Sequence, residues 1–293
     1  MKDAVRLLVY LIATVLAGAL LAPPLFWAAQ GVAAHGSLTF LARFDFETFF
    51  HRALLIAAAI LLWPLIRSLR VRSLNDLQLN PNPDRARYLT AGFALSTIPL
   101  VCCGAILLAT PILSLRGGIN WPGVAKVVAA AAVVPLIEEA FFRGLVLGAL
   151  LKSGRRRMSI FATSALYSIV HFLKAPAHTS PTVSWLSGFN SIAHAFVQFA
   201  DPILIAAGFT TLFLIGWILA EARLDTKSLW LPIGLHSGWI FASGIFNKIT
   251  ARQFSALPWL GKNLLVGIVP LAVVCLTWLL MRGWLKYVDA RNT

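Results

Sequence analysis

Long apolar runs alternate with short polar segments along the whole chain, and this pattern predicts transmembrane helices. About 20 consecutive apolar residues are enough to cross the hydrocarbon core of a bilayer as a helix. The runs predict about eight spans, at residues 7–22, 53–66, 88–110, 124–151, 158–173, 202–220, 228–246 and 263–281. The expected fold class is therefore an all-α polytopic membrane protein, a bundle of about eight transmembrane helices.

We expect three parts along this predicted bundle. Residues 1–119 hold three helices and a cytoplasmic loop, residues 120–247 hold the polar motifs described below, and residues 248–293 hold the last helix and a basic tail. Pro23 and Pro24 follow the first apolar run, and we expect a loop at residues 30–52. The mixed segment 183–201 is expected to be re-entrant or interfacial.

Composition excludes a soluble protein. The chain has 293 residues, 59% apolar and 12% charged, whereas about a quarter of the residues of a soluble protein are charged. The net charge of +14 does not indicate a nucleic-acid partner, because the basic residues cluster in short loops beside apolar segments. That pattern is typical of cytoplasmic loops that face anionic lipid headgroups. We expect membrane lipids as partners and no nucleic acid.

The same basic residues predict the orientation of the chain. With the amino terminus inside, Lys and Arg in the predicted inner segments outnumber those in the outer segments about two to one. We therefore expect a multi-pass protein with both termini in the cytoplasm. As a separate expectation, the membrane is a bacterial inner membrane.

Two adjacent carboxylates and an arginine interrupt the apolar run 124–151. Glu139 and Arg143 are four residues apart, on one face of a helix, and can pair. Glu138 lies about 100° round the helix and has no local counter-charge. Charged side chains inside a span are costly and usually carry function. The alternative is a structural charge cluster that locks two helices together.

Two histidines in other spans are expected to join these carboxylates. Glu138 lies 14 residues before the basic turn 152–157 and His171 lies 14 residues after it, so both are about 21 Å from the turn. His236 lies nine residues beyond Lys227, about 13 Å in by the same rise, one to two turns below Glu138. Each histidine alone could be a packing residue, but three polar residues from three spans predict an intramembrane site.

Three motifs in order resemble the CAAX prenyl protease and bacteriocin-processing (CPBP) family of intramembrane glutamic endopeptidases. They are Glu138-Glu139-x-x-x-Arg143, the aromatic-x-x-x-His pair Tyr167 and His171, and the sequence from Ser228 to Pro232 that leads into His236. The resemblance covers roughly residues 120–247. It implies hydrolysis of a peptide bond near the membrane, of a CAAX-type tail, a leader peptide or a sorting tail.

The resemblance also implies roles for these residues. Glu138, helped by His171, would activate a water, His236 would stabilise the oxyanion, and the pair of Glu139 with Arg143 would hold the glutamate helix. Two departures stand out. Tyr167 replaces the family's usual Phe, and Ile240 stands where the family usually has Asn or Asp.

Ile240 cannot donate a hydrogen bond to the oxyanion. Either Ser237, Asn190 or a backbone N–H takes over this role, or activity is weak or absent.

Two other classes of function fit the same residues. Glu138, His171 and His236 make a two-His, one-carboxylate set of the kind that holds catalytic zinc, although no His-Glu-x-x-His motif exists, and we expect no cofactor. Midplane carboxylates and histidines also occur in proton relays of transporters, but no internal repeat supports transport. A catalytically silent, immunity-like scaffold remains the other alternative, favoured by Ile240.

Overall fold

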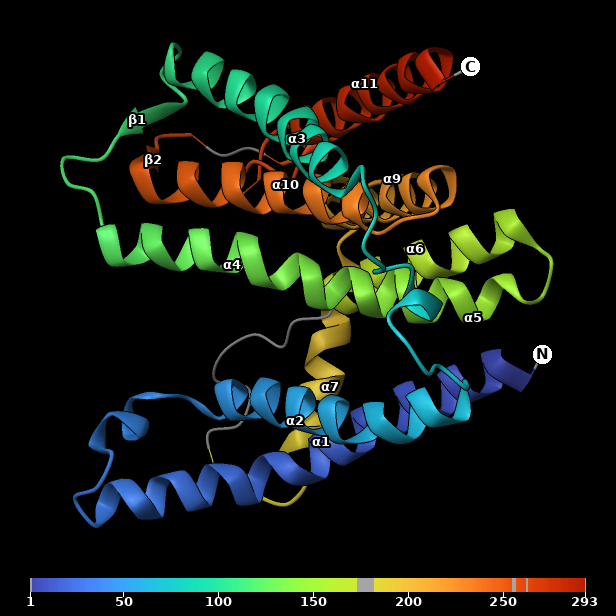
Figure 1. Ribbon diagram of the computed structural model, residues 1–293. Helices are drawn as coiled ribbons and strands as arrows, with labels where there is room; N and C mark the ends of the chain where they lie inside the picture. The colour runs from blue at the N-terminus through green and yellow to red at the C-terminus, as the bar shows by residue number, and fades with distance from the viewer. Residues whose placement is uncertain (1, 173–181, 255–256, 262, 293) are drawn as a thin grey trace. The chain divides into compact units, whose positions relative to one another are not determined.

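The computed structural model describes residues 2–172, 182–254, 257–261 and 263–292, and the chain folds into two compact units (Figure 1). The first unit comprises residues 1–72 and 173–201, and the second comprises residues 73–172 and 202–293. Leu173, the last residue of the predicted fifth span, lies outside the described residues.

The first unit is built on a hairpin of two long helices, α1 (Lys2–Ala34) and α2 (Phe46–Ser68), with the 3-10 turn η1 (Thr39–Arg43) between them. The short helix α7 (Ser187–Phe196), followed by the 3-10 turn η4 (Val197–Ala200), packs against the hairpin. Phe26 of α1 makes edge-to-face contacts with Phe46 and Phe49 of α2. Small buried residues such as Ala19 and Ala53 let the two helices approach closely.

The predicted loop at residues 30–52 is wrong at both of its ends. Helix α1 continues through Pro23 and Pro24 to Ala34, and α2 already begins at Phe46, where the Asp45 side chain accepts a hydrogen bond from the Thr48 backbone N–H (3.2 Å) and caps the helix.

A proline inside a helix leaves the carbonyl four residues earlier without its helical partner. For Pro23 this carbonyl belongs to Ala19, and a Cβ on Gly188 of α7 would overlap it. Gly188 thus lets α7 lie directly against the part of α1 where Pro23 and Pro24 remove helical hydrogen bonds.

The second unit contains all the predicted site residues. Its elements are η2 (Asn75–Leu77), α3 (Arg85–Leu108), β1 (Leu113–Leu115), α4 (Trp121–Glu139), the π-helix η3 (Ala140–Val146), α5 (Leu147–Leu151), α6 (Arg156–Phe172), α8 (Pro202–Leu204), the π-helix η5 (Ile205–Phe209), α9 (Thr210–Thr226), α10 (Trp230–Ile249), β2 (Thr250–Arg252) and α11 (Ile268–Asn292).

Helix α10 is the centre of this unit, because it packs against α3, α4 and α9 and every residue from 231 to 239 is buried. Three glycines bring α3 and α10 into backbone contact. A Cβ on Gly92 of α3 would meet the Leu231 carbonyl at 2.6 Å, and Cβ atoms on Gly234 and Gly238 would overlap atoms of α3. Close approach through small residues is the usual packing device of helices in membranes.

The second unit is not purely helical. Strands β1 and β2 form an antiparallel ladder in which Leu113 pairs with Arg252 and Leu115 with Thr250. The Arg116 side chain adds a hydrogen bond from Nε to the Thr250 carbonyl (2.8 Å). This ladder ties the end of α3 to the end of α10.

Five helices of the described chain are long and apolar enough to cross a membrane. They are α1, α2, α3, the continuous segment Pro202–Thr226 and the part of α11 from Ile268 to Val288. The predicted count of eight is therefore not confirmed. Helix α6 has only 17 residues, and the predicted span 124–151 is interrupted by the π-helix η3.

Candidate active site

The two adjacent carboxylates lie at the end of α4. This helix begins at Trp121, where Asn120 caps it by accepting a hydrogen bond from the Gly123 N–H (2.9 Å). It ends at Glu139, and the next seven residues form the π-helix η3. Single π-helical turns inside helices frequently occur at functional sites. Nothing in the spacing of apolar residues predicted this change of helical geometry.

Glu139 and Arg143 form the ion pair that their spacing predicts. The Arg143 Nη1 atom lies 2.9 Å from Glu139 Oε1, and both side chains are 0% exposed. Arg143 also donates from Nη2 to the Gly216 carbonyl of α9 (3.2 Å). A fully buried pair needs such additional hydrogen bonds to offset its desolvation. The pair therefore joins the glutamate helix to α9.

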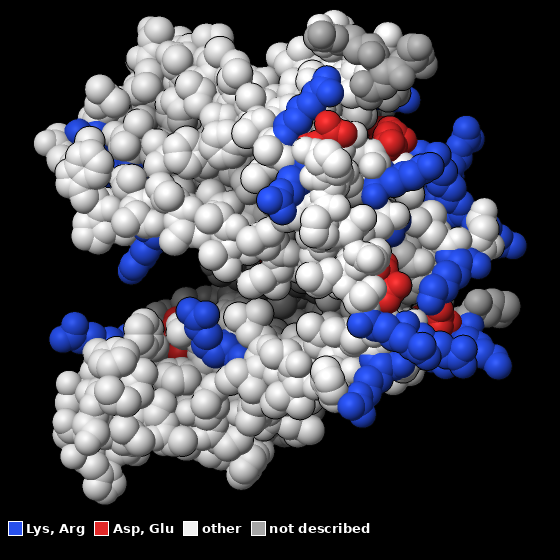
Figure 2. All heavy atoms as spheres, in the orientation of Figure 1, with Lys and Arg blue, Asp and Glu red and all other residues white. Residues whose placement is uncertain are grey.

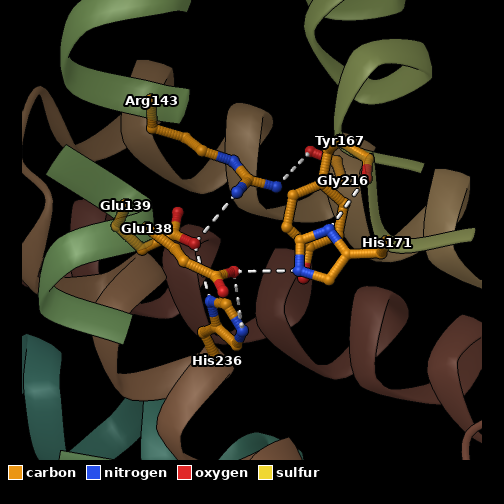
Figure 3. Close-up of polar contacts among 7 residues, drawn as sticks. All are labelled: Glu138, Glu139, Arg143, Tyr167, His171, Gly216 and His236. Carbon is orange, nitrogen blue, oxygen red and sulfur yellow. Dashed lines mark hydrogen bonds and ion pairs between the residues drawn. The ribbon is translucent and has the colours of Figure 1, made fainter. Parts of the chain in front are cut away.

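His236 joins this buried pair from α10. Its Nδ1 atom lies 2.8 Å from Glu139 Oε1, the oxygen that also receives Arg143 (Figure 3). Since an ionised carboxylate only accepts hydrogen bonds, the hydrogen of His236 is on Nδ1. The other ring nitrogen, Nε2, lies 3.8 Å from Glu138 Oε2.

The sequence predicted His236 one to two turns below Glu138, which is the level of Arg143 on the glutamate helix. In the structure, His236 and Arg143 contact the same oxygen of Glu139. Helix α10, which carries His236, starts at Trp230, after an irregular turn in which Lys227 has a positive φ.

His171 of α6 lies against Glu138, as its depth predicted. Its Nε2 atom is 3.1 Å from Glu138 Oε2, and its Nδ1 atom is 2.8 Å from the Tyr167 carbonyl oxygen. A carbonyl only accepts, so the hydrogen of a neutral His171 is on Nδ1. The contact with Glu138 then needs one further proton, held either by the carboxylate or by Nε2. The 3.1 Å contact is short enough for a proton to pass between Glu138 and His171.

Exposure separates the five polar side chains into two groups. Glu138 and His171 are 26% and 29% exposed, whereas Glu139 and Arg143 are 0% exposed and His236 is 6% exposed. Figure 3 shows the Glu138 carboxylate between the two imidazole rings. A water or a substrate can therefore reach Glu138 and His171, while the buried residues hold them in place.

The contact of Tyr167 with Arg143 and the hydrogen bond from Arg143 to the Gly216 carbonyl were not predicted from the sequence. The Tyr167 ring lies between the Arg143 guanidinium, 4.5 Å from its centroid, and the His171 ring, 4.1 Å away. It is 3% exposed. Its spacing from His171 indicated only a shared face, and contact with Arg143 depends on how α6 packs against η3.

Ile240 takes the position of the family's amide, and the sequence offered Ser237 and Asn190 as substitutes. Ile240 is half-buried one turn further along α10, Ser237 is buried beside His236 on the same helix, and Asn190 lies on α7 in the other unit. Within the described ranges, no three His, Cys, Asp or Glu side chains are grouped so that they could hold a metal ion.

The comparison with protein families gives one match. Residues 120–242 match the family model "Type II CAAX prenyl endopeptidase Rce1-like", which confirms the resemblance seen in the three motifs. The matched segment contains Glu138, Glu139, Arg143, His171 and His236. Comparison with the curated proteins and with the solved structures gave no match. The five apolar helices and this match identify an integral membrane protein that is similar to CAAX-processing proteases.

Proposed function

We propose that this protein is an intramembrane endopeptidase that hydrolyses a peptide bond with a water activated by Glu138 and His171. The observation that carries the proposal is the 3.1 Å contact between these two partly exposed side chains. The family match over residues 120–242 supports the same reaction class.

The reaction begins with a water hydrogen-bonded to the Glu138 carboxylate. The carboxylate takes one proton from this water, and the oxygen attacks the carbonyl carbon of the scissile peptide bond. His171 stabilises the protonated glutamate through the same 3.1 Å contact. The tetrahedral intermediate then collapses, the C–N bond breaks, and the leaving amine receives the proton from the Glu138–His171 pair. General acid–base catalysis of this kind commonly contributes about 100- to 10,000-fold.

His236 is placed to stabilise the oxyanion, and Glu139 is placed to hold His236 in the required state. Because Nδ1 already donates to Glu139, Nε2 can donate to an oxyanion only when the ring carries a second proton. The resulting imidazolium forms an ion pair with the buried Glu139 carboxylate at 2.8 Å. A single oxyanion donor is commonly worth about 3 to 4 kcal/mol.

The substrate class follows from the location of the site. Its residues belong to helices of an integral membrane protein, so we propose a peptide that reaches the site from the membrane or from the cytoplasmic side. A CAAX-type tail, a leader peptide and a sorting tail all meet this description.

Ile240 favours a second candidate, a catalytically silent membrane scaffold. Without an amide one turn after His236, the oxyanion would rely on one side-chain donor. If the protein is a scaffold, replacing Glu138 should leave its fold and its partner binding unchanged. If it is an enzyme, the same replacement should abolish turnover.

The test is cleavage of a quenched fluorescent peptide library by the purified protein in detergent, comparing the wild type with Glu138→Gln. We expect a loss of about 100-fold or more in rate, with an unchanged melting temperature, since Glu138 is partly exposed. Activity that a chelator leaves intact supports the glutamate mechanism, whereas activity that a chelator removes and zinc restores supports a zinc protease. Equal cleavage by wild type and Glu138→Gln would contradict the proposal.

A further inference from the structure

A pocket of about 180 Å³ opens where three candidate spans of the second unit end, and none of the site residues lines it. Tyr88 of α3 lines it on one side, and Asp225 lines it from α9. Helix α11 contributes two basic side chains, Arg282 and Lys286. The remaining lining residues are Thr226, Leu285 and Val288, so the pocket combines charged groups with apolar ones.

The charge of this pocket is positive. Asp225 is the one acidic residue among the described lining residues, and Arg156 of α6 pairs with it at 3.0 Å. This pair leaves the charges of Arg282 and Lys286 without a compensating carboxylate among the lining residues that the structure describes. The Arg282 guanidinium lies 5.1 Å from the centroid of the Trp278 ring, which orders it without neutralising it.

Aromatic residues beside the pocket are typical of the level of lipid headgroups. Tyr88 and Trp284 pack edge to face at 6.0 Å, and the Arg87 guanidinium lies 5.8 Å from the Trp284 ring centroid. Trp and Tyr concentrate where spans leave the hydrocarbon core. Figure 2 shows Lys and Arg side chains gathered toward the right of the view, where Figure 1 places the ends of α5, α9 and α11.

We propose that this pocket binds the phosphate headgroup of an anionic membrane lipid, with Arg282 and Lys286 as its phosphate contacts. Basic pockets between transmembrane helices are suited to anionic headgroups. The apolar side chains of Leu285 and Val288 would contact the first carbons of the lipid's acyl chains, next to the glycerol. A free phosphate shares the charge of the headgroup but would not make these contacts.

Native mass spectrometry of the purified full-length protein tests this site with phosphatidylglycerol and phosphatidylcholine of the same acyl chains. Wild type is expected to bind phosphatidylglycerol in preference to phosphatidylcholine. The double variant Arg282→Gln/Lys286→Gln is expected to bind phosphatidylglycerol roughly 30-fold more weakly, from about 1 kcal/mol for each basic residue. The charge-conserving variant Arg282→Lys/Lys286→Arg should retain binding.

A matched control removes two positive charges elsewhere in the same unit. Lys126 near the start of α4 and Lys248 near the end of α10 lie outside this pocket, and Lys126→Gln/Lys248→Gln should bind phosphatidylglycerol like the wild type. An equal loss in both double variants, or no loss in either, would overturn the proposal. Equal protection of the wild type from thermal unfolding by glycerol phosphate and by phosphatidylglycerol would assign the pocket to a soluble phosphate instead.

Discussion

Glu139 connects two other residues of the candidate site. Its Oε1 atom accepts hydrogen bonds from both Arg143 and His236, and its side chain is completely buried. Its other oxygen has no hydrogen-bond partner among the described residues. This carboxylate does not face the exposed part of the site. We therefore regard it as a positioning residue that acts through His236.

The substitution Glu139→Gln separates this role from packing. Glutamine keeps the volume and can still offer an oxygen to His236, but it removes the negative charge that an imidazolium needs. We expect kcat to fall about 100-fold or more, the range found for loss of one oxyanion donor, with KM little changed. Steady-state kinetics on a peptide identified in the library screen would measure both parameters.

Stability must be measured alongside, because Arg143 would be left buried without its counter-charge, at a cost of about 3 to 5 kcal/mol. The double variant Glu139→Gln/Arg143→Gln removes both charges and should recover much of the melting temperature without recovering kcat. Glu221→Gln is the matched control, since that carboxylate of α9 accepts from the indoles of Trp217 and Trp278 instead. Wild-type kcat in Glu139→Gln would refute the positioning role.

At the scale of elements, the position of His236 depends on the contact between α3 and α10. His236 lies between Gly234 and Gly238, the two glycines that allow α10 to touch α3. The start of α10 is held as well, because the Leu229 N–H donates to the Gln78 carbonyl (3.0 Å) and the Trp230 indole donates to the Asn80 carbonyl (3.1 Å). The loop before α3 thus fixes where α10 begins.

The substitution Gly234→Ala should disturb the site without touching a polar residue. Its Cβ would overlap the Leu89 carbonyl, so α10 must move away from α3 and carry His236 with it. We expect a lower melting temperature, because overpacking commonly costs about 1 to 3 kcal/mol of stability. We also expect at least about tenfold lower kcat/KM, because a displacement of about 1 Å at a site can cost about 100-fold in rate.

Gly283→Ala on α11 is the control for this change. A Cβ there meets nothing within 4 Å, and alanine is favoured over glycine in a helix by about 1 kcal/mol. This variant should melt at the wild-type temperature or above it and keep full activity. If both alanine variants behaved alike, close contact between α3 and α10 would not be what positions His236.

Helical periodicity predicted the contacts that lie within one helix or between helices joined by a tight turn. Glu139 and Arg143 pair because they are four residues apart, and His171 meets Glu138 because both are the same distance from the turn 152–157. The packing that positions His236 was not predicted, since it depends on how the loop before α3 holds α10. The π-helix η3 could not be predicted, because the spacing of apolar residues around it does not differ from that of an α-helix.

At the scale of the whole molecule, the charges of the second unit are distributed unevenly. One end carries Arg87 of α3, the basic turn between α5 and α6, and Arg282 and Lys286 of α11, and the ion pair of Arg156 with Asp225 joins α6 to α9 there. The opposite end, at the β1–β2 ladder, carries fewer basic residues, among them Arg116, Lys126, Lys248 and Arg252. Basic segments beside spans are retained in the cytoplasm.

This distribution predicts that the turn between α5 and α6 is cytoplasmic and that the segment between β1 and α4 faces outward. Ser153 lies in the turn between α5 and α6, and Gly118 lies between β1 and α4; both residues are exposed. The single substitutions Ser153→Cys and Gly118→Cys therefore report on which side of the membrane each segment lies. The native cysteines at positions 102, 103 and 275 are first replaced by alanine. A membrane-impermeant maleimide should label Gly118→Cys in intact cells, and should label Ser153→Cys only after permeabilisation. The reverse labelling would place the basic end outside, which would contradict both the predicted orientation and a substrate that arrives from the cytoplasm.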